Sequence, residues 1–409
     1  MRAKLKRVAS VYTGSTPPTG VESYYTSEDV AWYTPGDIPD ESICSKGASK
    51  SISKLYFDEK SCKIFPKESV LMVGIGATVG KVCYCEQPCY ANQQINAIIF
   101  NRNEVLPKYG AYFLLNISKV IKSITPIVTL QIFNQSKVKQ IEIDYPDLEI
   151  QRRIVSYLDS KTAEIDNQIS LLAKKRDAYM RLKKSIINRA VTQGLNPDVE
   201  MKESGIDWIG MLPKHWEIKR IKELCPFISR GSTPDYVDEG DYLVMNQAVF
   251  SSGSINYEIV RFSSYMKEDS KIEKGDLLIA STGGGILGKL YFFDDEQIFY
   301  ADTHVTIVRN KKKSFHVKFL YYLLSIGYNM INSCMAKGST NQTELQRDKL
   351  IAFEIAVPPL DEQKQIIEYL DIKCANIEAA IKNIGRQIDA SKRLKRALIN
   401  EVVTGQRAV

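Results

Sequence analysis

The chain has few histidines and lacks the sequence motifs that mark common catalytic centres. Only His215, His304 and His316 occur among 409 residues, and none stands at a metal-ligand spacing. There is no nucleophile elbow, and the proline pairs in TPPT and VPPL do not make the Asn/Asp-Pro-Pro-Tyr/Phe motif expected of adenine or cytosine methyltransferases. The sequence therefore favours a protein that is not itself an enzyme.

Long hydrophobic runs are also missing. No apolar stretch reaches the length of a membrane span, and the start MRAKLKRVAS lacks the apolar centre of a signal peptide. We therefore expect a cytoplasmic protein with no membrane partner. Hydrophobic residues make up 44% of the chain and charged residues 25%, which is ordinary for globular domains with buried cores.

A glycine-rich stretch, GIGATVGK at residues 74–81, lacks the spacing of a phosphate-binding loop. Such a loop needs a glycine five places before the Gly-Lys pair and a hydroxyl residue after it, but this chain has Ile75 and Val82 there. The dinucleotide pattern fails as well, because its third glycine comes one place late, at Gly80. We expect these glycines to form a structural turn, and no cofactor to bind the chain.

The charge balance permits a nucleic-acid partner, and the cysteines leave a zinc site open. Lys and Arg exceed Asp and Glu by 55 to 48, which gives a net charge of +7. Cys44, Cys62, Cys83, Cys85 and Cys89 crowd into one stretch, and Cys83 and Cys85 would share a face of a strand. Their spacing is not Cys-x-x-Cys and no histidine is near, so buried free thiols are the more ordinary interpretation.

The chain contains an internal repeat. The stretch PDLEIQRRIVSYLDSKTAEID, from Pro146, reappears as PPLDEQKQIIEYLDIKCANIE from Pro358, and about 20 of roughly 47 positions match across the full segments. Weaker matches precede each copy in the same order: VYTGSTP and FISRGSTP, then VGIGATVGKV and ASTGGGILGKL, then YFLLNI and YYLLSI. The chain is therefore two tandem units, each a variable domain followed by a uniform segment.

The two uniform segments are predicted to be long helices, Leu148 to Thr192 and Leu360 to Thr404, with Gly194 and Gly405 as stops. Apolar residues recur every seven positions, which predicts a seam for another helix. The seam positions are Leu158, Ile165, Leu172, Tyr179 and Ile186, then Leu370, Ile377, Ile384 and Leu398, with Ser391 the one break. About 45 residues make a rod of roughly 65 to 70 Å, and antiparallel pairing of the two helices is the economical arrangement.

The predicted architecture is α+β. Short β-type runs such as VLMVGI and HVTIV, each domain with one amphipathic helical patch, predict two mixed α/β domains. The two helices pair as an antiparallel coiled coil, and the whole is a pseudo-two-fold internal repeat. The predicted bounds are 1–145 and 217–357 for the domains, 146–194 and 358–409 for the helices, with the tail in the latter, and 195–216 for a joining segment.

Amide and basic side chains in turn-like segments are candidates for DNA contacts. Asn and Gln can address adenine, Arg and Lys guanine, and Lys, Ser and Thr phosphates. Such loops can also be merely solvent-exposed. The candidates are Asn92, Gln93, Gln94, Gln131, Asn134, Gln135, Lys137, Arg230, Asn246, Gln247, Lys337, Ser339, Thr340, Asn341, Gln342 and Arg347.

Two alternatives come from other classes. A metal-dependent nuclease could use Asp40, Asp58 and Lys60, although an Asp/Glu-x-Lys triplet arises often by chance. A coiled-coil scaffold without a nucleic-acid role would use the helices alone. Magnesium-dependent cleavage by the isolated chain that Asp58→Ala abolishes would identify the first, and salt-independent behaviour toward DNA would identify the second.

The stretch SGIDWIGMLPKHWEIKR, from Ser204, together with PPLDEQKQIIEYLD and the Gly-Lys hairpins, resembles the specificity subunits of type I restriction-modification systems. The resemblance covers essentially the whole chain. It implies a catalytically silent subunit in which each domain reads one half of a split DNA target and the paired helices fix the gap. It also implies two methyltransferase subunits docked on the helices, carrying S-adenosylmethionine, and an assembly that recruits motor-nuclease subunits.

One departure concerns the N-terminus. The second domain is entered through DWIG and HWEIKR, whereas the first begins at KLKRVAS without such a lead. We expect the C-terminal tail to meet the N-terminus and close this edge in a circular arrangement.

Overall fold

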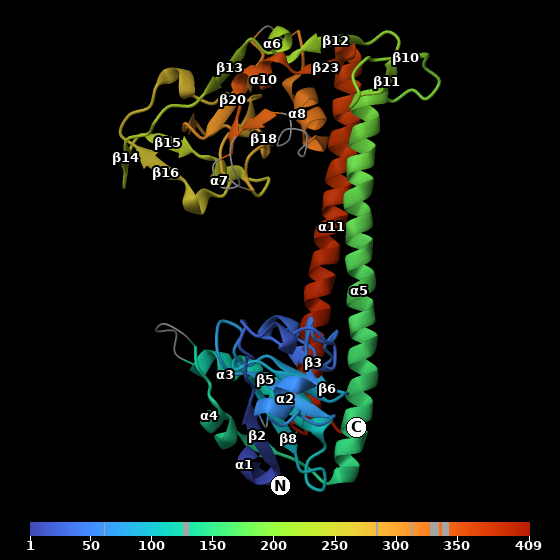
Figure 1. The fold of residues 1–409 in the computed structure, drawn as a ribbon. Helices are drawn as coiled ribbons and strands as arrows, with labels where there is room; N and C mark the ends of the chain where they lie inside the picture. Colours follow the sequence, from blue (N-terminus) through green and yellow to red (C-terminus); the bar gives the residue numbers. More distant parts are fainter. Residues whose placement is uncertain (61, 126–130, 284, 312–313, 328–334, 338–342) are drawn as a thin grey trace. The chain divides into compact units, whose positions relative to one another are not determined.

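The computed structural model describes residues 1–60, 62–125, 131–283, 285–311, 314–327, 335–337 and 343–409 (Figure 1). These residues form two compact units. The first contains Met1–Lys174 and Ile384–Val409, and the second contains Lys175–Asn383. Each unit holds one variable domain and a part of each long helix. Within the described part of the chain, no helix is both long enough and apolar enough to cross a membrane.

The two long helices are α5, Leu148–Gln193, and α11, Leu360–Val403. Both begin where the sequence predicts, and each ends within one residue of the predicted position. The heptad seam faces inward, as predicted. Leu158, Ile165, Leu370, Ile377, Ile384 and Leu398 are buried, and Leu172, Tyr179 and Ile186 are half-buried.

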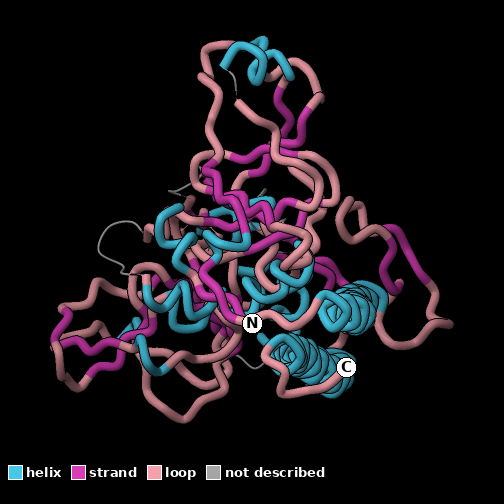
Figure 2. The backbone as a smooth tube through the Cα atoms, turned by 90° about the horizontal axis from the view of Figure 1, so that it is seen from below, coloured by secondary structure: helices cyan, strands magenta, loops and turns pink. Residues whose placement is uncertain are grey.

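Within each unit, α5 and α11 run side by side in opposite directions (Figures 1 and 2). In the first unit, Lys395 Nζ contacts Asp166 Oδ2 at 2.6 Å, and Arg153 donates to the carbonyl of Val409. In the second unit, Lys183 pairs with Glu378. A step of 17 residues from Asp166 to Lys183 on α5 thus matches 17 residues in reverse on α11, from Lys395 to Glu378. The predicted antiparallel pairing is confirmed.

The first domain is built on a four-stranded antiparallel sheet, in the order β2 (Ala9–Thr13), β8 (Ile95–Phe100), β5 (Ser69–Val73) and β6 (Val82–Cys85). All five residues of β5 are buried because both faces of the sheet are covered. Val70 and Met72 pack in the cluster that includes α3 (Pro107–Ile124) and the long helices. Leu71 and Val73 pack in a second cluster, with the small sheet β4 (Lys50–Ile52), β3 (Val30–Tyr33), β7 (Cys89–Ala91) and with α2 (Lys54–Lys60).

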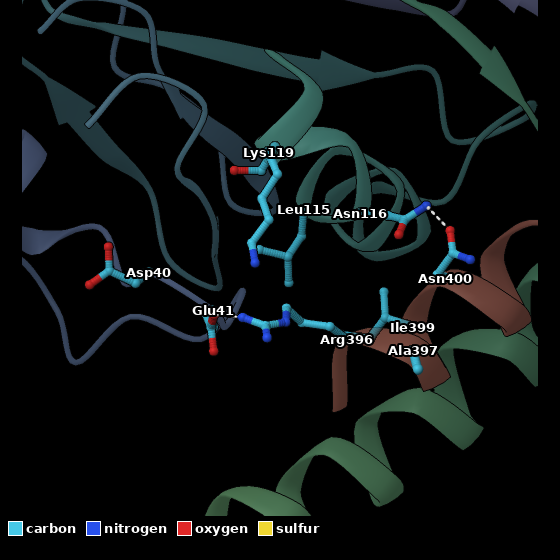
Figure 3. A pocket seen from close by; sticks show the side chains of 10 residues that line it. Asp40, Glu41, Leu115, Asn116, Lys119, Arg396, Ala397, Ile399 and Asn400 are labelled. Atoms are coloured by element: carbon cyan, nitrogen blue, oxygen red, sulfur yellow. Dashed lines mark hydrogen bonds and ion pairs between the residues drawn. The ribbon is translucent and has the colours of Figure 1, made fainter. Parts of the chain in front are cut away.

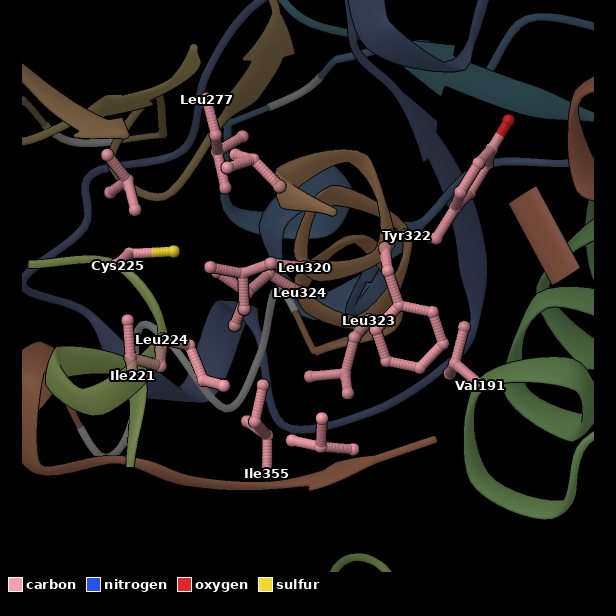
Figure 4. Packing of buried hydrophobic residues seen from close by; sticks show 14 of the residues in the cluster. Val191, Ile221, Leu224, Cys225, Leu277, Leu320, Tyr322, Leu323, Leu324 and Ile355 are labelled. Carbon is pink, nitrogen blue, oxygen red and sulfur yellow. The ribbon is translucent and has the colours of Figure 1, made fainter. Parts of the chain in front are cut away.

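The second domain repeats this order with β13 (Phe227–Arg230), β20 (Val305–Arg309), β17 (Leu277–Ala280) and β18 (Leu290–Phe292). Leu277 and Ile279 pack with α8 (Val317–Ile326) and with residues of both long helices (Figure 4). Leu278 and Ala280 face the other cluster. The neighbouring sheet orders β14 (Tyr236–Val237), β16 (Arg261–Ser263), β15 (Tyr242–Met245) and β19 (Tyr300–Ala301). The parallel pair β15–β19 matches β3–β7 of the first domain.

Each domain is closed by an antiparallel strand pair formed from its two ends. In the first domain β1 (Arg2–Lys4) pairs with β9 (Glu142–Asp144), and in the second β12 (Glu217–Arg220) pairs with β23 (Glu354–Val357). The first domain therefore closes like the second. The short helices beside these pairs are α1 (Leu5–Val8), α4 (Gln135–Gln140), α6 (Ile221–Leu224) and α10 (Arg347–Ala352).

The joining segment forms a hairpin, β10 (Met201–Glu203) with β11 (Met211–Pro213), followed by the fully buried Trp216. Trp216 Nε1 donates to Glu362 Oε2 at 3.1 Å in the first turn of α11. This segment therefore belongs to the core of the second unit. The remaining elements are α7 (Gln247–Phe250), β21 (Ala336–Lys337), β22 (Glu344–Leu345) and the 3₁₀ turns Glu22–Tyr24, Pro35–Asp37, Tyr257–Ile259 and Glu268–Ser270.

Candidate nucleic-acid interface

Three polar segments of the first domain meet at the hairpin that joins β5 to β6. The Gly74 amide donates to the Gln94 carbonyl at 2.7 Å, and the Gly76 amide donates to the Gln131 carbonyl at 2.9 Å. The Phe133 amide returns a bond to the Gly74 carbonyl at 2.7 Å. Backbone hydrogen bonds therefore assemble residues 74–76, 92–94 and 131–135 into one surface, which we call the polar corner of the first domain.

The second domain builds the same corner with different side chains. The Ser281 amide donates to the His304 carbonyl at 2.8 Å, and the Gly283 amide donates to the Thr343 carbonyl at 3.3 Å. The Leu345 amide donates to the Ser281 carbonyl at 2.8 Å. Residues 281–283, 302–304 and 343–347 thus form the polar corner of the second domain, and each backbone bond has its counterpart in the first domain.

The turn inside each corner is fixed by a short acceptor side chain. Asn92 Oδ1 accepts from the amide of Gln94 at 3.1 Å, and Asp302 Oδ1 accepts from the amide of His304 at 2.8 Å. Both acceptors are buried. Asn and Asp side chains commonly stabilise a turn by accepting a hydrogen bond from the backbone amide two residues later. Burial raises the pKa of Asp302 above its ordinary value. The main role of Asn92 in this structure is therefore to shape the turn.

The glycine stretches are structural turns, as predicted. Gly80 and Gly288 have φ of 89° and 79°, a region that side chains rarely adopt. The amide of Gly80 donates to the Val73 carbonyl at 2.9 Å, and that of Gly288 donates to the Ala280 carbonyl at 2.8 Å. Each glycine closes a β-hairpin and positions the corner at the hairpin tip.

The repeated Gly-Ser-Thr-Pro motif brings another backbone segment against the corner. A Cβ atom on Gly14 would lie 2.0 Å from the carbonyl oxygen of Ala91, and one on Gly231 would lie 2.0 Å from that of Ala301. The next amide, of Ser15 or of Ser232, donates to this same carbonyl at 2.9 or 3.1 Å. Only glycine permits this close approach, which explains why the motif has a glycine at this position in both copies.

Several predicted contact residues use their polar groups inside the domain. Asn134 and Asn246 cap α4 and α7 through their side-chain oxygens. Gln135 Nε2 donates to the carbonyl of Val11, and Arg347 Nε donates to the corresponding carbonyl of Ile228 at 3.0 Å. Gln131 is buried, with Nε2 3.3 Å from the Thr125 carbonyl, and Arg230 pairs with Glu344.

The other predicted contact residues lie at the surface, at or beside the corners. Gln93, Lys137 and Lys337 are exposed, and Gln94 and Gln247 are half-buried. Thr16 Oγ1 hydrogen-bonds Gln93 Oε1, which draws the Gly-Ser-Thr-Pro segment to the first corner. Four predictions, Ser339, Thr340, Asn341 and Gln342, lie outside the described residues.

His304 is an exposed corner residue that was not among the sequence-based candidates. In the sequence, His304 suggests only a possible metal ligand, and no other ligand stands at a suitable spacing from it. Aligning ANQQI, from Ala91, with ADTHV, from Ala301, places His304 opposite Gln94. The repeat itself therefore contained the signal that could have identified it.

Matching contacts fix each domain on its own part of the helix pair. Gln151 Oε1 accepts from the amide of Leu106 at 2.8 Å, and Gln363 Oε1 accepts from the amide of His316 at 2.9 Å. Gln151 and Gln363 are both buried on the first turns of α5 and α11. A buried amide satisfied by backbone groups holds the start of α3 and α8 in a defined position.

A second pair of contacts lies about two turns further along each helix. Tyr112 Oη donates to Asp159 Oδ1 at 2.8 Å, and Lys108 Nζ lies 2.7 Å from Asp159 Oδ2. In the second unit, Tyr322 donates to Asp371, and Lys318 Nζ lies 2.7 Å from it. Burial, followed in effect by the nearby carboxylate, raises the pKa of Tyr322 far above its ordinary value, so the hydroxyl is a donor.

Two cavities of the first unit lie between its domain and α11. One, of about 340 Å³, is crossed by the pair Arg396–Glu41, and Asn116 Nδ2 donates to Asn400 Oδ1 at 3.1 Å (Figure 3). The other, of about 760 Å³, is lined by residues that include Met1 and Arg2, the end of α11 at Val402 and Val403, and most of the tail that follows, up to Val409. The two termini therefore line one cavity, as predicted, but the edge of the first domain is closed by β9 pairing with β1, and not by the C-terminal tail.

The cysteines and the Asp40 triplet show no metal-binding geometry. Cys83, Cys85 and Cys89 are buried together in the core beneath the first sheet, and they are free thiols. Hydrogen bonds from Cys83 and then Cys89 lower the pKa of Cys85 below its ordinary value. Asp40 Oδ1 instead lies 2.8 Å from Lys81 Nζ. In the part of the chain that the structure describes, no group of three or more His, Cys, Asp or Glu side chains could hold a metal ion.

The chain matches the model of one protein family twice. The model, described as the type I restriction modification DNA specificity domain, covers residues 2–175 and 213–385. Each match contains one variable domain and about the first half of the helix that follows it.

Individual relatives agree with this match. The chain is 22% identical over 355 residues to the type I restriction enzyme MjaVIII specificity subunit of Methanocaldococcus jannaschii, covering 84% of this chain and 80% of that one. It is 18% identical over 358 residues to the EcoBI specificity subunit of Escherichia coli, covering 84% and 74%. A solved chain of a type I R-M system superposes on this chain with a TM-score of 0.72 at 17% identity, covering 98% of this chain and 97% of that one. The HsdS subunit of Thermoanaerobacter tengcongensis superposes with a TM-score of 0.50 at 17% identity, covering 100% of this chain and 97% of that one. These structural similarities show a shared fold.

Proposed function

Because the chain belongs to the family of type I restriction-modification DNA specificity domains, it is a subunit that recognises DNA sequence, and we propose that each polar corner reads one half of a bipartite target. The observation that carries this proposal is the repetition of the corner. Its backbone hydrogen bonds are the same in both domains, while its exposed side chains differ. A common frame with different side chains suits two readers of two different half-sites.

The chemistry of the corners suits duplex DNA. Exposed amide and basic side chains such as Gln93, Lys137 and Lys337 supply donors for base edges and charge for phosphates. The hairpin tips at Gly76 and Gly283 carry no side chain, which allows a phosphate backbone to come close. Two such readers on one face of a duplex fit half-sites about one helical turn, or about 10 base pairs, apart.

The helix pair is proposed to set the gap between the half-sites. Each domain is fixed to its own part of the pair by a buried glutamine and by a tyrosine and lysine on one aspartate, as with Gln151, Tyr112, Lys108 and Asp159 in the first unit. Because each domain is anchored on its own part of the helices, the number of helical residues between the anchors would determine the separation that the chain can span.

The helices also present a surface for partners. Large apolar side chains are exposed on their outer positions, where a solvated helix would carry polar groups. We propose that two methyltransferase subunits dock there and supply S-adenosylmethionine and the methyl-transfer chemistry. The chain would then be a non-catalytic cytoplasmic subunit, to which motor-nuclease subunits can be added. These exposed residues are Leu171, Met180, Leu182, Ile372 and Leu394.

Mapping of modified adenines tests the recognition function directly. The chain is expressed with its methyltransferase in a host without this system, and genomic methylation is read by long-read sequencing. One split motif with a fixed gap is the expected result, and it should be absent when the chain is omitted. Methylation that does not depend on the chain, in cells where the complex is shown to assemble, would refute the proposal and favour the scaffold alternative.

A matched deletion tests the role of the helices. Residues 168–174 of α5 lie opposite 387–393 of α11 in the register fixed by Asp166–Lys395 and Lys183–Glu378. Deleting both heptads keeps that register and shortens the pair by about 10 Å. The recognised half-sites should stay the same while the gap becomes shorter, by about three base pairs at 3.4 Å per pair. A folded variant with an unchanged gap would show that the helices do not set it.

Charge placed on the outer helix surface tests the docking. Leu182→Glu and Ile372→Glu should prevent co-purification with the methyltransferase subunit, because a carboxylate cannot be buried unpaired in an apolar interface. Ser170→Glu, at an exposed polar position of α5, is the control. Native mass spectrometry of each complex gives the subunit ratio. Retention of two methyltransferase subunits by both leucine and isoleucine variants would place the docking surface elsewhere.

A further inference from the structure

Gln94 and His304 occupy the same place in the two polar corners. Each follows its turn acceptor by two residues, and each offers its carbonyl to the first residue of the hairpin loop, Gly74 at 2.7 Å or Ser281 at 2.8 Å. The hairpin tips beside them correspond as well, since Ile75 and Thr282 form matching bridges to Ile132 and Glu344. The backbone therefore places a side chain at the same point in both domains. This side chain is the amide of Gln94 in the first domain and the imidazole of His304 in the second.

The two side chains are held by different partners. In the first domain, Asn92 Nδ2 donates to Gln94 Oε1 at 3.1 Å. In the second, Asn92 is replaced by Asp302, and Thr282 supplies the partner instead, with its Oγ1 2.6 Å from His304 Nδ1. The first domain has Ile75 at the position of Thr282. Each corner thus fixes this side chain with its own hydrogen bond. Fixing a side chain costs conformational entropy, and a residue that only faces water does not need to be fixed.

The fixed side chain leaves one polar group outward in each corner. Gln94 Nε2 and His304 Nε2 make no hydrogen bond with the described residues. A Cβ on Gly76 would lie 3.6 Å from Gln94 Nε2, so this amide nitrogen lies close to the bare hairpin tip. A ligand that reaches over the tip would therefore meet this nitrogen.

We propose that His304 is a specificity-determining residue of the second domain and that its Nε2 contacts an edge of a base in the half-site, at the position corresponding to the Gln94 contact in the other half-site. Thr282 acts as a positioning residue, because its hydroxyl lies 2.6 Å from His304 Nδ1 and holds the ring, whereas Nε2 is the atom proposed to meet the base. The two half-sites would then differ at this position because an amide and an imidazole form different hydrogen bonds. The proposal rests on the function proposed above, and it assigns the residue that reads.

Exchange of the two side chains is the test. The full complex is assembled with His304→Gln, with Gln94→His, and with His316→Gln as the matched control, which makes the same substitution at the start of α8 in the same domain. Methylation is then measured on a library of duplexes in which each base pair of the mapped target is varied. Thr282→Val is included because it keeps the shape of Thr282 and removes only the hydroxyl.

We expect His304→Gln to change base preference by about tenfold at one position of one half-site, and Gln94→His to do so in the other half. Thr282→Val should weaken preference at the same position as His304→Gln, and His316→Gln should change nothing. If wild type methylates a split target and His304→Gln leaves every preference unchanged, the assignment is wrong while the function stands. If wild type shows no chain-dependent split target, the function itself has failed. Preference lost equally at all positions would assign His304 to stability alone.

Discussion

The two domains share the backbone arrangement of the main sheet but differ in one pair of side chains that connects its two middle strands. In the second domain Arg309 on β20 makes two bonds with the buried Asp276 at the start of β17, from Nε to Oδ1 at 2.7 Å and from Nη2 to Oδ2 at 2.6 Å. The first domain has Ser69 and Ile99 at these sheet positions, and Ser69 Oγ donates to the Pro66 carbonyl at 2.7 Å. The same sheet can therefore contain a buried ion pair at this place, or a serine and an isoleucine. The backbone hydrogen bonds between the strands, and not this side-chain pair, define the fold.

The largest expected effect comes from breaking the ion pair. Asp276→Ala leaves Arg309 buried without its main acceptor and should lower the free energy of unfolding of the second unit by about 3–5 kcal/mol. The matched change Ser69→Ala should cost the first unit only about 1 kcal/mol. Hydrogen exchange resolved by unit, on the full chain, measures both. Equal losses in the two units would mean that the pair contributes nothing special.

A smaller effect is expected where the two domains are alike. Gly14→Ala and Gly231→Ala each place a Cβ 2.0 Å from a carbonyl oxygen, so the backbone must shift. Each should destabilise its own unit by about 3 kcal/mol. Gly20→Ala is the control, because a Cβ there meets nothing within 4 Å. Chemical denaturation of the three variants gives the comparison, and a Gly231→Ala variant as stable as Gly20→Ala would contradict the close approach.

The helix anchors should respond equally and more weakly. Tyr112→Phe and Tyr322→Phe remove a hydroxyl that donates to Asp159 or Asp371. Hydrogen bonds to charged groups contribute about 1.5 kcal/mol or somewhat more, so each unit should lose about that amount. Hydrogen exchange of α3 and α8 reports the loosening of the two domains. An effect in only one unit would show that the repeated contact is not energetically repeated.

The smallest effect concerns phosphate contacts. Lys137→Ala and Lys337→Ala remove exposed cations beside the two corners. Each should weaken DNA binding of the complex by a similar factor for every sequence and reduce the salt-dependence slope by about one unit. Titrations at several salt concentrations measure the slope. A change in base preference instead would make the lysine a reader of bases.

Much of the architecture follows from periodicity alone. The seven-residue spacing within Leu158–Ile186 and within Leu370–Leu398 predicted both long helices and a seam between them, because an apolar seam is stable only against another helix. The length of the helices then favoured antiparallel pairing. The glycine stretches were correctly predicted as turns, because in both copies of the repeat they stand between β-type runs and lack the spacing of a phosphate loop. The two β-rich domains were predicted only in outline, since short strands such as β3 and β7 depend on partners far along the chain.

The candidate contact residues show the limit of reasoning from composition. Asn134, Gln135, Asn246 and Arg347 have side chains suited to DNA, yet their polar groups cap helices or hold strands. His304 was not among the candidates because a single histidine matches no motif, and only its alignment with Gln94 in the repeat points to it. A polar side chain in a loop has the same sequence signature whether it bonds to the backbone or points outward, so only the fold separates the two cases.

The sequence by itself determined the repeat, the paired helices and the membership of the chain in a DNA-specificity family, because these rest on local period and on similarity between segments. The tertiary structure decided which polar residues share a surface. It brought Gly74, Gln94 and Gln131 together in one domain and Ser281, His304 and Thr343 in the other, through backbone bonds between segments distant in sequence. Those bonds carry no signature of side-chain type, so the surface they create becomes visible only when the chain is folded.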